Sequence, residues 1–474
     1  MLLYSARYIQ NQLKISAIKH YNAVYEKIWY NLMTNKYYIK TFGCQMNEYD
    51  SEKIGGVLSK KNQLTETSAP EDADLIILNT CSIREKAEVK VFSDLGRFRE
   101  LKEKKPNLRI AVGGCVASQE GENIIKRAPY VDLVFGPQSL HRVSELLNKR
   151  EISGKPQIDI TFPEIEKFDH IPIINKNRAS ASVSIMEGCS KYCSFCVVPF
   201  TRGEEISRHL EGILNEIVRL TFNGVSEITL LGQNVNAYRG KMDNGEIADF
   251  SLLLEYVAEI KEIKRIRFTT SHPNEMTDNL INCFGSIDKL AKTIHLPIQS
   301  GSDRVLSAMK RNYTTLEYRS IIRKIRRVCP EISLTSDFII GFPNETDNEF
   351  ESTIKIMKDL EFDYSFSFLY SPRPGTPASY IEDSIPNEVK QQRLEELQNI
   401  NVSQGKAYTQ SMQGTSQRVL FDHYSKKNKD VLLGKTDNNR IVEANADSGL
   451  LNKFVNVKVA KTDTKNLQIG SLIS

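Results

Sequence analysis

From residue 37 onward, short apolar runs alternate with longer amphipathic stretches. The run Leu75–Asn79 is apolar on both faces, which is typical of a buried parallel strand. The first predicted strands are Tyr38–Phe42, Leu75–Asn79, Arg109–Gly113 and Val131–Phe135, and the predicted helices are Asp50–Leu58, Ile83–Lys104 and Gln138–Asn148. This alternation predicts an α/β fold in which residues 35–152 form an open parallel α/β domain.

Six further apolar runs alternate with helical stretches over residues 175–408, after a proline-containing segment at 153–174 that indicates a linker. The predicted strands are Ala181–Met186, Glu227–Leu231, Arg265–Thr270, Thr293–Pro297, Leu334–Ile340 and Ser365–Tyr370. Two of the intervening helices begin with a T-x-x-E pattern, which predicts capping boxes at Thr314 and Thr346. Six strand–helix units predict a partial (βα)6 barrel whose chemistry lies at the C-terminal ends of its strands.

The pattern changes after a predicted helix at Glu388–Ser411. Short alternating segments predict a small antiparallel β-barrel over residues 410–474, which carries ten Lys/Arg residues against six acidic residues. Basic barrels with exposed aromatic side chains bind single-stranded RNA, and Phe421, His423 and Tyr424 are the candidates. A solvated basic face without an RNA partner is the alternative.

Composition sets the class of protein. The net charge is +4 over 474 residues, which permits a polyanionic partner without requiring one. No apolar run reaches the roughly 18 residues of a membrane-spanning helix, so we expect no membrane association. The eight cysteines are too sparse for a disulfide scaffold and fit a reducing compartment, so we expect a cytoplasmic protein.

Residues 1–34 form an N-terminal extension that lacks the apolar core of a secretory signal. We expect a dispensable helix, or an over-long reading frame whose true start is Met33, with a basic targeting presequence as the alternative.

Three cysteines, Cys189, Cys193 and Cys196, lie within eight residues in a C-x3-C-x2-C pattern directly after a predicted strand. Three thiolates on one loop can hold a 4Fe–4S cluster while leaving one iron open to a small molecule. A structural zinc site requires four ligands, and an odd number of clustered cysteines suits disulfides badly. The spacing resembles that of radical S-adenosylmethionine (SAM) enzymes.

Three other cysteines, Cys44, Cys81 and Cys115, each follow the C-terminal end of a predicted strand. In a parallel sheet these ends share one edge, so we expect the three thiols to converge on a second cluster with an open iron. Such a cluster could carry electrons or deliver sulfur, and the missing fourth ligand favours sulfur delivery. The alternative is that they are buried core thiols. Cys283 and Cys329 belong to no motif and read as ordinary helix residues.

Polar residues at the ends of the later strands are the candidates for SAM binding. They are Gln233, Asn234, Ser271, Gln299, Ser300 and Asp337, with Gly341-Phe342-Pro343 as weaker candidates. Each is individually unspecific, because Gly, Ser and Asn are also common loop formers.

Together, the cluster loop and the segments around Cys44, Cys81 and Cys115 resemble the methylthiotransferase family of radical SAM enzymes over about residues 35–474. The resemblance implies two 4Fe–4S clusters and a C-terminal RNA-binding domain of the TRAM type. It also implies that one SAM methylates a sulfur held at Cys44, Cys81 and Cys115, while a second SAM is cleaved at the other cluster to give a radical. The segment Asn79–Arg84 resembles the branch that converts N6-isopentenyladenosine, next to the tRNA anticodon, to its 2-methylthio derivative.

The same resemblance implies partners. They are the tRNA anticodon stem-loop and an electron donor such as flavodoxin or ferredoxin, and we expect the enzyme to be a monomer. Sister enzymes acting on threonylcarbamoyladenosine in tRNA or on an aspartate of a ribosomal protein are the alternatives. A further alternative is a non-enzymatic RNA-binding protein whose iron–sulfur clusters are only structural.

Overall fold

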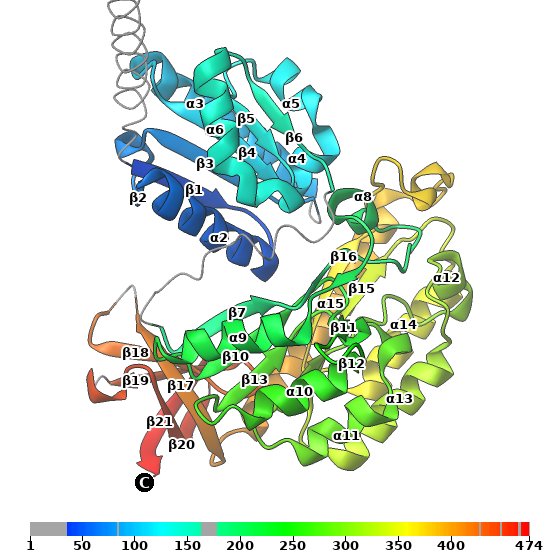
Figure 1. Ribbon diagram of the computed structural model, residues 1–474. Coiled ribbons are helices and arrows are strands. Elements are labelled where there is room, and N and C mark those ends of the chain that lie inside the picture. Colours follow the sequence, from blue (N-terminus) through cyan, green and yellow to red (C-terminus); the bar gives the residue numbers. More distant parts are fainter. Residues whose placement is uncertain are drawn as a thin grey trace, which may run out of the picture. The chain divides into compact units, whose positions relative to one another are not determined.

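The computed structural model describes residues 36–82, 85–162, 178–425, 428–445, 448–462 and 466–473 (Figure 1). The chain divides into two compact units, Met1–Pro172 and Ile173–Ser474. The N-terminal extension and most of the expected linker lie outside the described residues. Within the described residues, no helix has both the length and the apolar character to cross a membrane.

The first unit contains a six-stranded, fully parallel sheet in the order β2-β1-β3-β4-β5-β6. Its strands are β1 (Lys36–Thr41), β2 (Thr65–Glu66), β3 (Leu75–Thr80), β4 (Arg109–Gly114), β5 (Leu133–Phe135) and β6 (Gln157–Asp159). Its helices are α2 (Gln45–Asn62), α3 (Glu85–Lys104), α4 (Cys115–Glu120), α5 (Glu122–Arg127) and α6 (Val143–Ser153), with short 3-10 turns η1 (Pro70–Asp72) and η2 (Pro137–Arg142). The predicted parallel α/β sheet is confirmed, but β2 and β6 were not predicted, and β6 occupies part of the expected linker.

Alternate residues of β3 pack into different cores, which explains why this strand is apolar throughout. Leu75 and Ile77 join one core with α2 and α6, whereas Ile76 and Leu78 join another with α3 and α5. Helices therefore cover both faces of the sheet, as a buried parallel strand requires.

The second unit begins with six parallel strands in chain order, which we call the core sheet. They are β7 (Ser180–Ser184), β10 (Glu227–Leu231), β13 (Arg265–Phe268), β14 (Thr293–His295), β15 (Ser333–Ile340) and β16 (Tyr364–Leu369). A parallel bridge between Ile266 and Leu290 joins the first three strands to the last three. The six predicted parallel strands are all present.

Helices pack against one face of the core sheet (Figure 1). These helices are α9 (Leu210–Thr221), α10 (Phe250–Glu259), α11 (Asp278–Ser286), α12 (Asp303–Ala308), α13 (Thr315–Val328) and α14 (Asp347–Leu360), while the short helix α8 (Val198–Arg202) follows the cysteine loop. Small additions are β8 (Met186–Glu187), β9 (Ile206–Ser207), β11 (Arg239–Lys241), β12 (Ile247–Asp249), η3 (Val235–Ala237), η4 (Pro273–Glu275) and η5 (Pro377–Tyr380). Both predicted capping boxes are confirmed, because Thr314 pairs with Glu317 and Thr346 with Glu349. Cys283 lies within α11 and Cys329 caps the end of α13.

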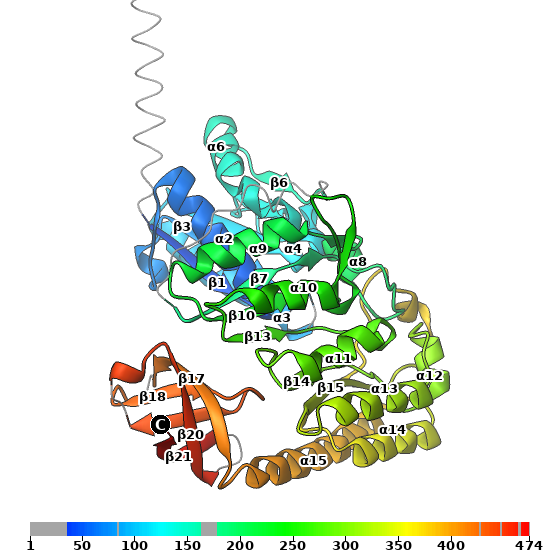
Figure 2. The same cartoon turned by 60° about the horizontal axis from the view of Figure 1, so that its bottom comes forward.

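Helix α15 (Asn387–Ser411) leads from the core sheet to a closed five-stranded barrel in the order β17-β18-β19-β21-β20 (Figure 2). The strands are β17 (Ser416–Tyr424), β18 (Val431–Lys435), β19 (Ile441–Asn445), β20 (Lys453–Thr462) and β21 (Asn466–Ile473), with η6 (Ser448–Leu450) between β19 and β20. The expected barrel is present, but β21 was not predicted and pairs in parallel with β19, so the barrel is not wholly antiparallel.

The barrel core corrects one sequence prediction. Phe421 was expected to face RNA, but its side chain is 0% exposed and packs with Val419, Leu432 and Val442. The pairing of β17 with β18 is irregular between Phe421 and His423, so simple alternation does not identify the outward side chains. His423 is exposed and Tyr424 is half-buried.

Buried arginines connect the core sheet to the barrel. Arg265 and Arg267, on β13, both donate to the Glu227 carboxylate at the start of β10. Arg265 also donates to Asp437 Oδ1 at 2.7 Å, and Arg267 donates to the carbonyl oxygens of Thr436 and Asp437, both at 2.6 Å. These bonds fix the β18–β19 turn to the N-terminal ends of the core strands.

Candidate active site

The cysteine loop follows β7 and β8 and ends at α8, which places Cys189, Cys193 and Cys196 at the C-terminal end of the first core strand. The Cys189 amide donates to the Gly203 carbonyl at 3.2 Å, and the Cys196 amide donates to the Cys193 carbonyl at 3.0 Å. The loop is therefore a closed turn that carries three thiols.

Gly188 is required for this turn. Its φ is +76°, and a Cβ atom built on it would lie 1.9 Å from the Glu204 carbonyl oxygen. Its amide donates to Gln233 Oε1 at 2.6 Å, so the end of β10 holds the entrance to the loop. Gln233, predicted to bind SAM, is thus engaged with the loop.

The three sulfur atoms of the loop do not all lie within 4.8 Å of one another. Among the described residues, the one group of three Cys, His, Asp or Glu ligand atoms within 4.8 Å of one another is His209, Glu211 and Asp243. Tetrahedral zinc–sulfur bonds would bring the sulfurs within about 3.8 Å of one another. All eight cysteines, each in a described stretch, are thiols and not disulfides.

Burial raises the pKa of two of the loop thiols, Cys189 and Cys196. Desolvation, followed by the neighbouring Cys193, raises the pKa of the Cys196 thiol to about 12. A bound metal deprotonates its thiol ligands, so an iron centre would supply the missing positive charge.

Arg311 supplies a fixed positive charge beside the loop, and sequence reasoning missed it. Its Nη1 lies 3.6 Å from Cys193 Sγ, and its Nη2 donates to the Pro297 carbonyl at 2.8 Å. Its Nε donates to the hydroxyl of Tyr313 at 2.9 Å. It lies in the connection between α12 and α13, where no motif drew attention to it.

Ion pairs also hold the cysteine loop in place. Glu187, directly before Gly188, accepts from Arg202 at 2.7 Å, and both side chains are buried. Lys191 pairs with Glu275 from η4. The turn is therefore held by ion pairs as well as by its backbone.

Within the described part of the chain, three of the predicted SAM contacts have buried polar atoms that make no well-formed hydrogen bond. These atoms are Asn234 Oδ1 and Nδ2, Ser271 Oγ and Gln299 Oε1, which follow β10, β13 and β14 respectively. A buried polar atom left unpaired costs about 1–3 kcal/mol. Their positions at successive strand ends fit a polar ligand such as the methionine and ribose parts of SAM.

Gln299 is held in an unusual conformation. Its φ is +75°, and its backbone bonds to the β15 residues Asp337 and Ile339, both at 2.9 Å. A left-handed non-glycine residue needs such support. The side-chain amide is thereby fixed at the end of the core sheet.

The other candidates already have protein partners. Ser300 Oγ accepts from the Ser302 amide at 3.2 Å, and Asp337 Oδ2 lies 3.4 Å from His295 Nε2. The amide of Gly341, a weaker candidate, donates to Glu345 at 2.9 Å.

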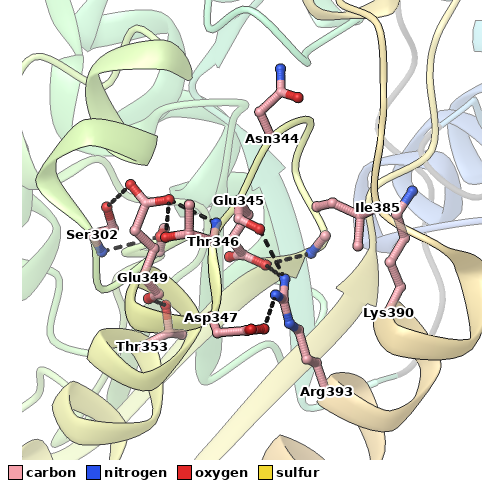
Figure 3. Close-up of polar contacts among 12 residues, drawn as sticks. Ser302, Asn344, Glu345, Thr346, Asp347, Glu349, Thr353, Ile385, Lys390 and Arg393 are labelled. Carbon is pink, nitrogen blue, oxygen red and sulfur yellow. Dashed lines mark hydrogen bonds and ion pairs between the residues drawn. The ribbon is translucent and has the colours of Figure 1, made fainter.

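The loop after β15 is braced by α15 (Figure 3). Arg393 Nη1 donates to the Glu345 backbone carbonyl at 3.1 Å, and its Nη2 donates to Asp347 at 2.6 Å. On the other side of the same loop, Glu349 accepts from Ser302 at 3.1 Å and from Arg304. Ion pairs thus hold the loops after β14 and β15 together.

The first unit has its own cysteine site. Cys44 precedes α2, Cys81 follows β3 and Cys115 begins α4. A Cβ atom on Gly43, whose φ is +115°, would lie 2.8 Å from Cys81 Sγ. The first two cysteine segments therefore lie in direct contact, as expected for neighbouring strand ends.

Neutral side chains connect these segments. Asn47 Nδ2 donates to the Thr80 carbonyl at 2.9 Å, and Asn47 Oδ1 lies 3.3 Å from Cys44 Sγ. Thr80 Oγ1 donates to the Gly113 carbonyl at 2.6 Å and accepts from the Val116 amide at 3.2 Å. The cysteine-bearing ends of β3 and β4 are thus joined to the start of α2.

Comparisons with known proteins agree with this architecture. A model of the Radical SAM superfamily matches residues 183–357, and a model described as uncharacterized protein family UPF0004 matches residues 36–136. A solved radical S-adenosylmethionine methyltransferase, TsrM from Kitasatospora setae, has a TM-score of 0.53 at 14% identity and covers 73% of this chain and 75% of its own. The fold and the three-thiol loop define a radical SAM enzyme.

Relatives that match almost their whole length to this chain show which radical SAM enzymes it resembles. The tRNA-2-methylthio-N(6)-dimethylallyladenosine synthase of Chromobacterium violaceum is 60% identical over 93% of this chain and 99% of its own length. The synthase of the same name from Methylobacillus flagellatus is 58% identical over 93% of this chain and 100% of its own length. The chain belongs to the family of tRNA-2-methylthio-N(6)-dimethylallyladenosine synthases.

Proposed function

We propose that this chain transfers a methylthio group to carbon 2 of N6-dimethylallyladenosine next to the tRNA anticodon, using two 4Fe–4S clusters and two molecules of SAM. The observation that carries the proposal is the three-thiol loop at the end of the core sheet, beside buried and unpaired polar groups on the next strands. The names of the relatives supply the substrate and the product.

Cys189, Cys193 and Cys196 would hold the cluster that binds SAM. When bound, a cluster with one open iron chelates SAM and supplies the electron that splits its C–S bond. Arg311 would place a positive charge beside the Cys193 sulfur, and Asn234, Ser271 and Gln299 would orient SAM across the strand ends.

Cys44, Cys81 and Cys115 would hold a second cluster, whose open iron carries the sulfur to be methylated. The hydrogen bonds of Asn47 and Thr80 support this role, because they hold the three cysteine segments side by side. An external one-electron donor such as flavodoxin or ferredoxin would reduce the radical-generating cluster.

The basic barrel would bind the anticodon arm of tRNA as a TRAM-type domain. His423 and Tyr424 remain candidates for base contacts, whereas Phe421 is removed by its burial in the barrel core. Affinity from a basic surface of this kind falls steeply as salt concentration rises.

Nucleoside analysis of tRNA tests the proposal. A bacterial strain that lacks its own synthase is complemented with this chain, and its tRNA is digested and analysed by mass spectrometry. We expect 2-methylthio-dimethylallyladenosine to reappear. Methylthiolation of threonylcarbamoyladenosine instead, or tRNA that still carries dimethylallyladenosine without sulfur, would contradict the proposal.

A further inference from the structure

Among the described residues, the helices pack against one face of the core sheet, and the barrel turn at Thr436 and Asp437 covers the N-terminal end of the other face, at Arg265 and Arg267. Alternate residues, including Ile228, Ile266 and Leu334, pack with the helices in the main core. The residues between them point to the opposite side, which we call the inner face. The inner face carries the strand-end groups assigned above to SAM.

The edge strand β16 presents an aromatic row on this inner face. Tyr364, Phe366 and Phe368 are 41%, 43% and 40% exposed, and they alternate with Ser365 and Leu369, which face α15 and the helices. Tyr364 and Phe366 pack edge to face with ring centroids 5.0 Å apart. Three adjacent aromatic side chains therefore form one apolar surface.

The exposure of this row is not caused by an unprotected strand edge. Asn401 of α15 accepts from the Ser365 amide and donates to the Ser365 carbonyl, both at 2.8 Å. Exposed strand edges are prone to pair with other strands. On the outer edge of β16, the backbone groups of Ser365 are already paired with Asn401. The aromatic side chains stay uncovered although the backbone beside them is satisfied.

The rest of the inner face is different. On β7 and β10 the corresponding positions are polar, and Ser182 lies beside Thr229 in register. The row itself borders a polar pair, since His295 packs edge to face with Phe366 at 6.3 Å and contacts Asp337 at 3.4 Å. An apolar patch rimmed by polar groups is typical of a binding surface.

The row lies close to the proposed site of chemistry. Phe366 is the register partner of Asp337 on β15. The Asp337 carbonyl in turn accepts from the Gln299 amide at 2.9 Å. One strand therefore separates the centre of the row from a group assigned to SAM.

We propose that Tyr364, Phe366 and Phe368 bind the dimethylallyl group of the substrate adenosine, an inference that rests on the proposed function. This group is a branched, uncharged five-carbon chain, and its burial against aromatic rings is favourable by the hydrophobic effect. The carboxylate of a threonylcarbamoyl group would instead lose its hydration against the same rings. The row therefore selects the prenylated base over the substrate of the sister enzyme.

Binding of three anticodon stem-loops tests this inference. The RNAs differ in one base, which is dimethylallyladenosine, adenosine or threonylcarbamoyladenosine, and affinities are measured with the cluster-loaded protein and SAM, without a reductant. The unaltered protein should prefer the prenylated RNA. Phe366→Ala should weaken binding of the prenylated RNA by about tenfold, which is the effect of losing a small apolar contact. Its affinity for the adenosine RNA should be unchanged.

Matched variants keep the inference falsifiable. Phe368→Ala should reproduce the effect and Phe366→Leu should reduce it, while Phe222→Ala, an exposed aromatic after α9, should change no affinity. Equal weakening of the prenylated and adenosine RNAs would assign the row to general base stacking and overturn the inference. A preference that survives both alanine variants would overturn it as well, whereas absence of any preference in the unaltered protein would contradict the proposed substrate itself.

Discussion

The two sets of cysteines are positioned by different parts of the fold. Cys189, Cys193 and Cys196 lie on one turn, whereas Cys44, Cys81 and Cys115 each follow the C-terminal end of one of three neighbouring parallel strands. The turn is braced by ion pairs such as Glu187–Arg202, and the sheet edge is connected by neutral groups such as Asn47 and Thr80. The position of cysteines on one turn depends on the geometry of that turn. The position of cysteines at the ends of separate strands depends on how the whole sheet pairs.

The largest expected effect comes from the turn. Gly188→Ala places a Cβ atom 1.9 Å from a backbone carbonyl, so the loop cannot keep its conformation. We expect SAM cleavage to fall by about 10- to 100-fold, as for the loss of support around a metal site. The measurement is 5′-deoxyadenosine formation together with iron per chain. Gly212→Ala, where a Cβ atom meets nothing within 4 Å, is the control, and equal activity of both variants would contradict the account.

Removal of the Arg311 charge should affect one site and spare the other. In Arg311→Met, loss of the positive donor beside Cys193 destabilises the reduced state of the radical-generating cluster. We expect its potential to fall by about 60 mV, a tenfold change in a one-electron equilibrium. A redox titration followed by electron paramagnetic resonance measures this shift. Arg311→Lys keeps a positive charge, so its potential should fall by less than that of the methionine variant. An unchanged potential in Arg311→Met would contradict the role assigned to Arg311.

Asn47→Ala probes the sheet-edge site. It removes the bond to the Thr80 carbonyl and the contact with Cys44, so we expect a loss of about 1–3 kcal/mol in the stability of the first unit. Methylthiolation should fall while SAM cleavage continues. Thermal unfolding and product analysis measure the two effects, with the exposed Asn148→Ala as control. A parallel fall in SAM cleavage would show that the sites are not separable in this way.

Acid should weaken the ion pair that connects the loops after β14 and β15, and this is the smallest expected effect. The Arg304 guanidinium lowers the pKa of Glu349 from 4.5 to about 2. The resulting stability is present above pH 4.5 and is lost as the pH falls towards 2. In Glu349→Gln, the free energy of unfolding that is lost on acidification should be smaller by about 1 kcal/mol or less, because solvent screens the ion pair. Unfolding of the cluster-free protein at several acidic pH values measures it, and an unchanged acid dependence would contradict the assignment.

Sequence reasoning succeeded where local pattern controls structure. The spacing of Cys189, Cys193 and Cys196 and the T-x-x-E capping boxes depend on neighbouring residues, and the apolar run Leu75–Asn79 identified a buried strand whose end carries Cys81. The ligand roles of the cysteines and the domain boundaries stay predictions.

It failed where long-range pairing decides. Phe421 lies on the same inward face as Val419, which is buried by closure of the barrel, and β21 is placed by parallel pairing with β19. Arg311 reaches Cys193 across 118 residues of sequence, so no local pattern could identify it. The aromatic row alternates along β16, but its exposure became evident only when the helices were seen to cover the other face.

The most direct test of two sites with separate tasks compares two cysteine variants under reducing conditions with SAM and the prenylated stem-loop. Cys193→Ala should form neither 5′-deoxyadenosine nor methylthiolated product. Cys44→Ala should still form 5′-deoxyadenosine but no methylthiolated product, whereas Cys283→Ala, at a buried thiol outside both sites, should form both. Methylthiolated product from Cys44→Ala would contradict the division of labour between the turn and the sheet edge.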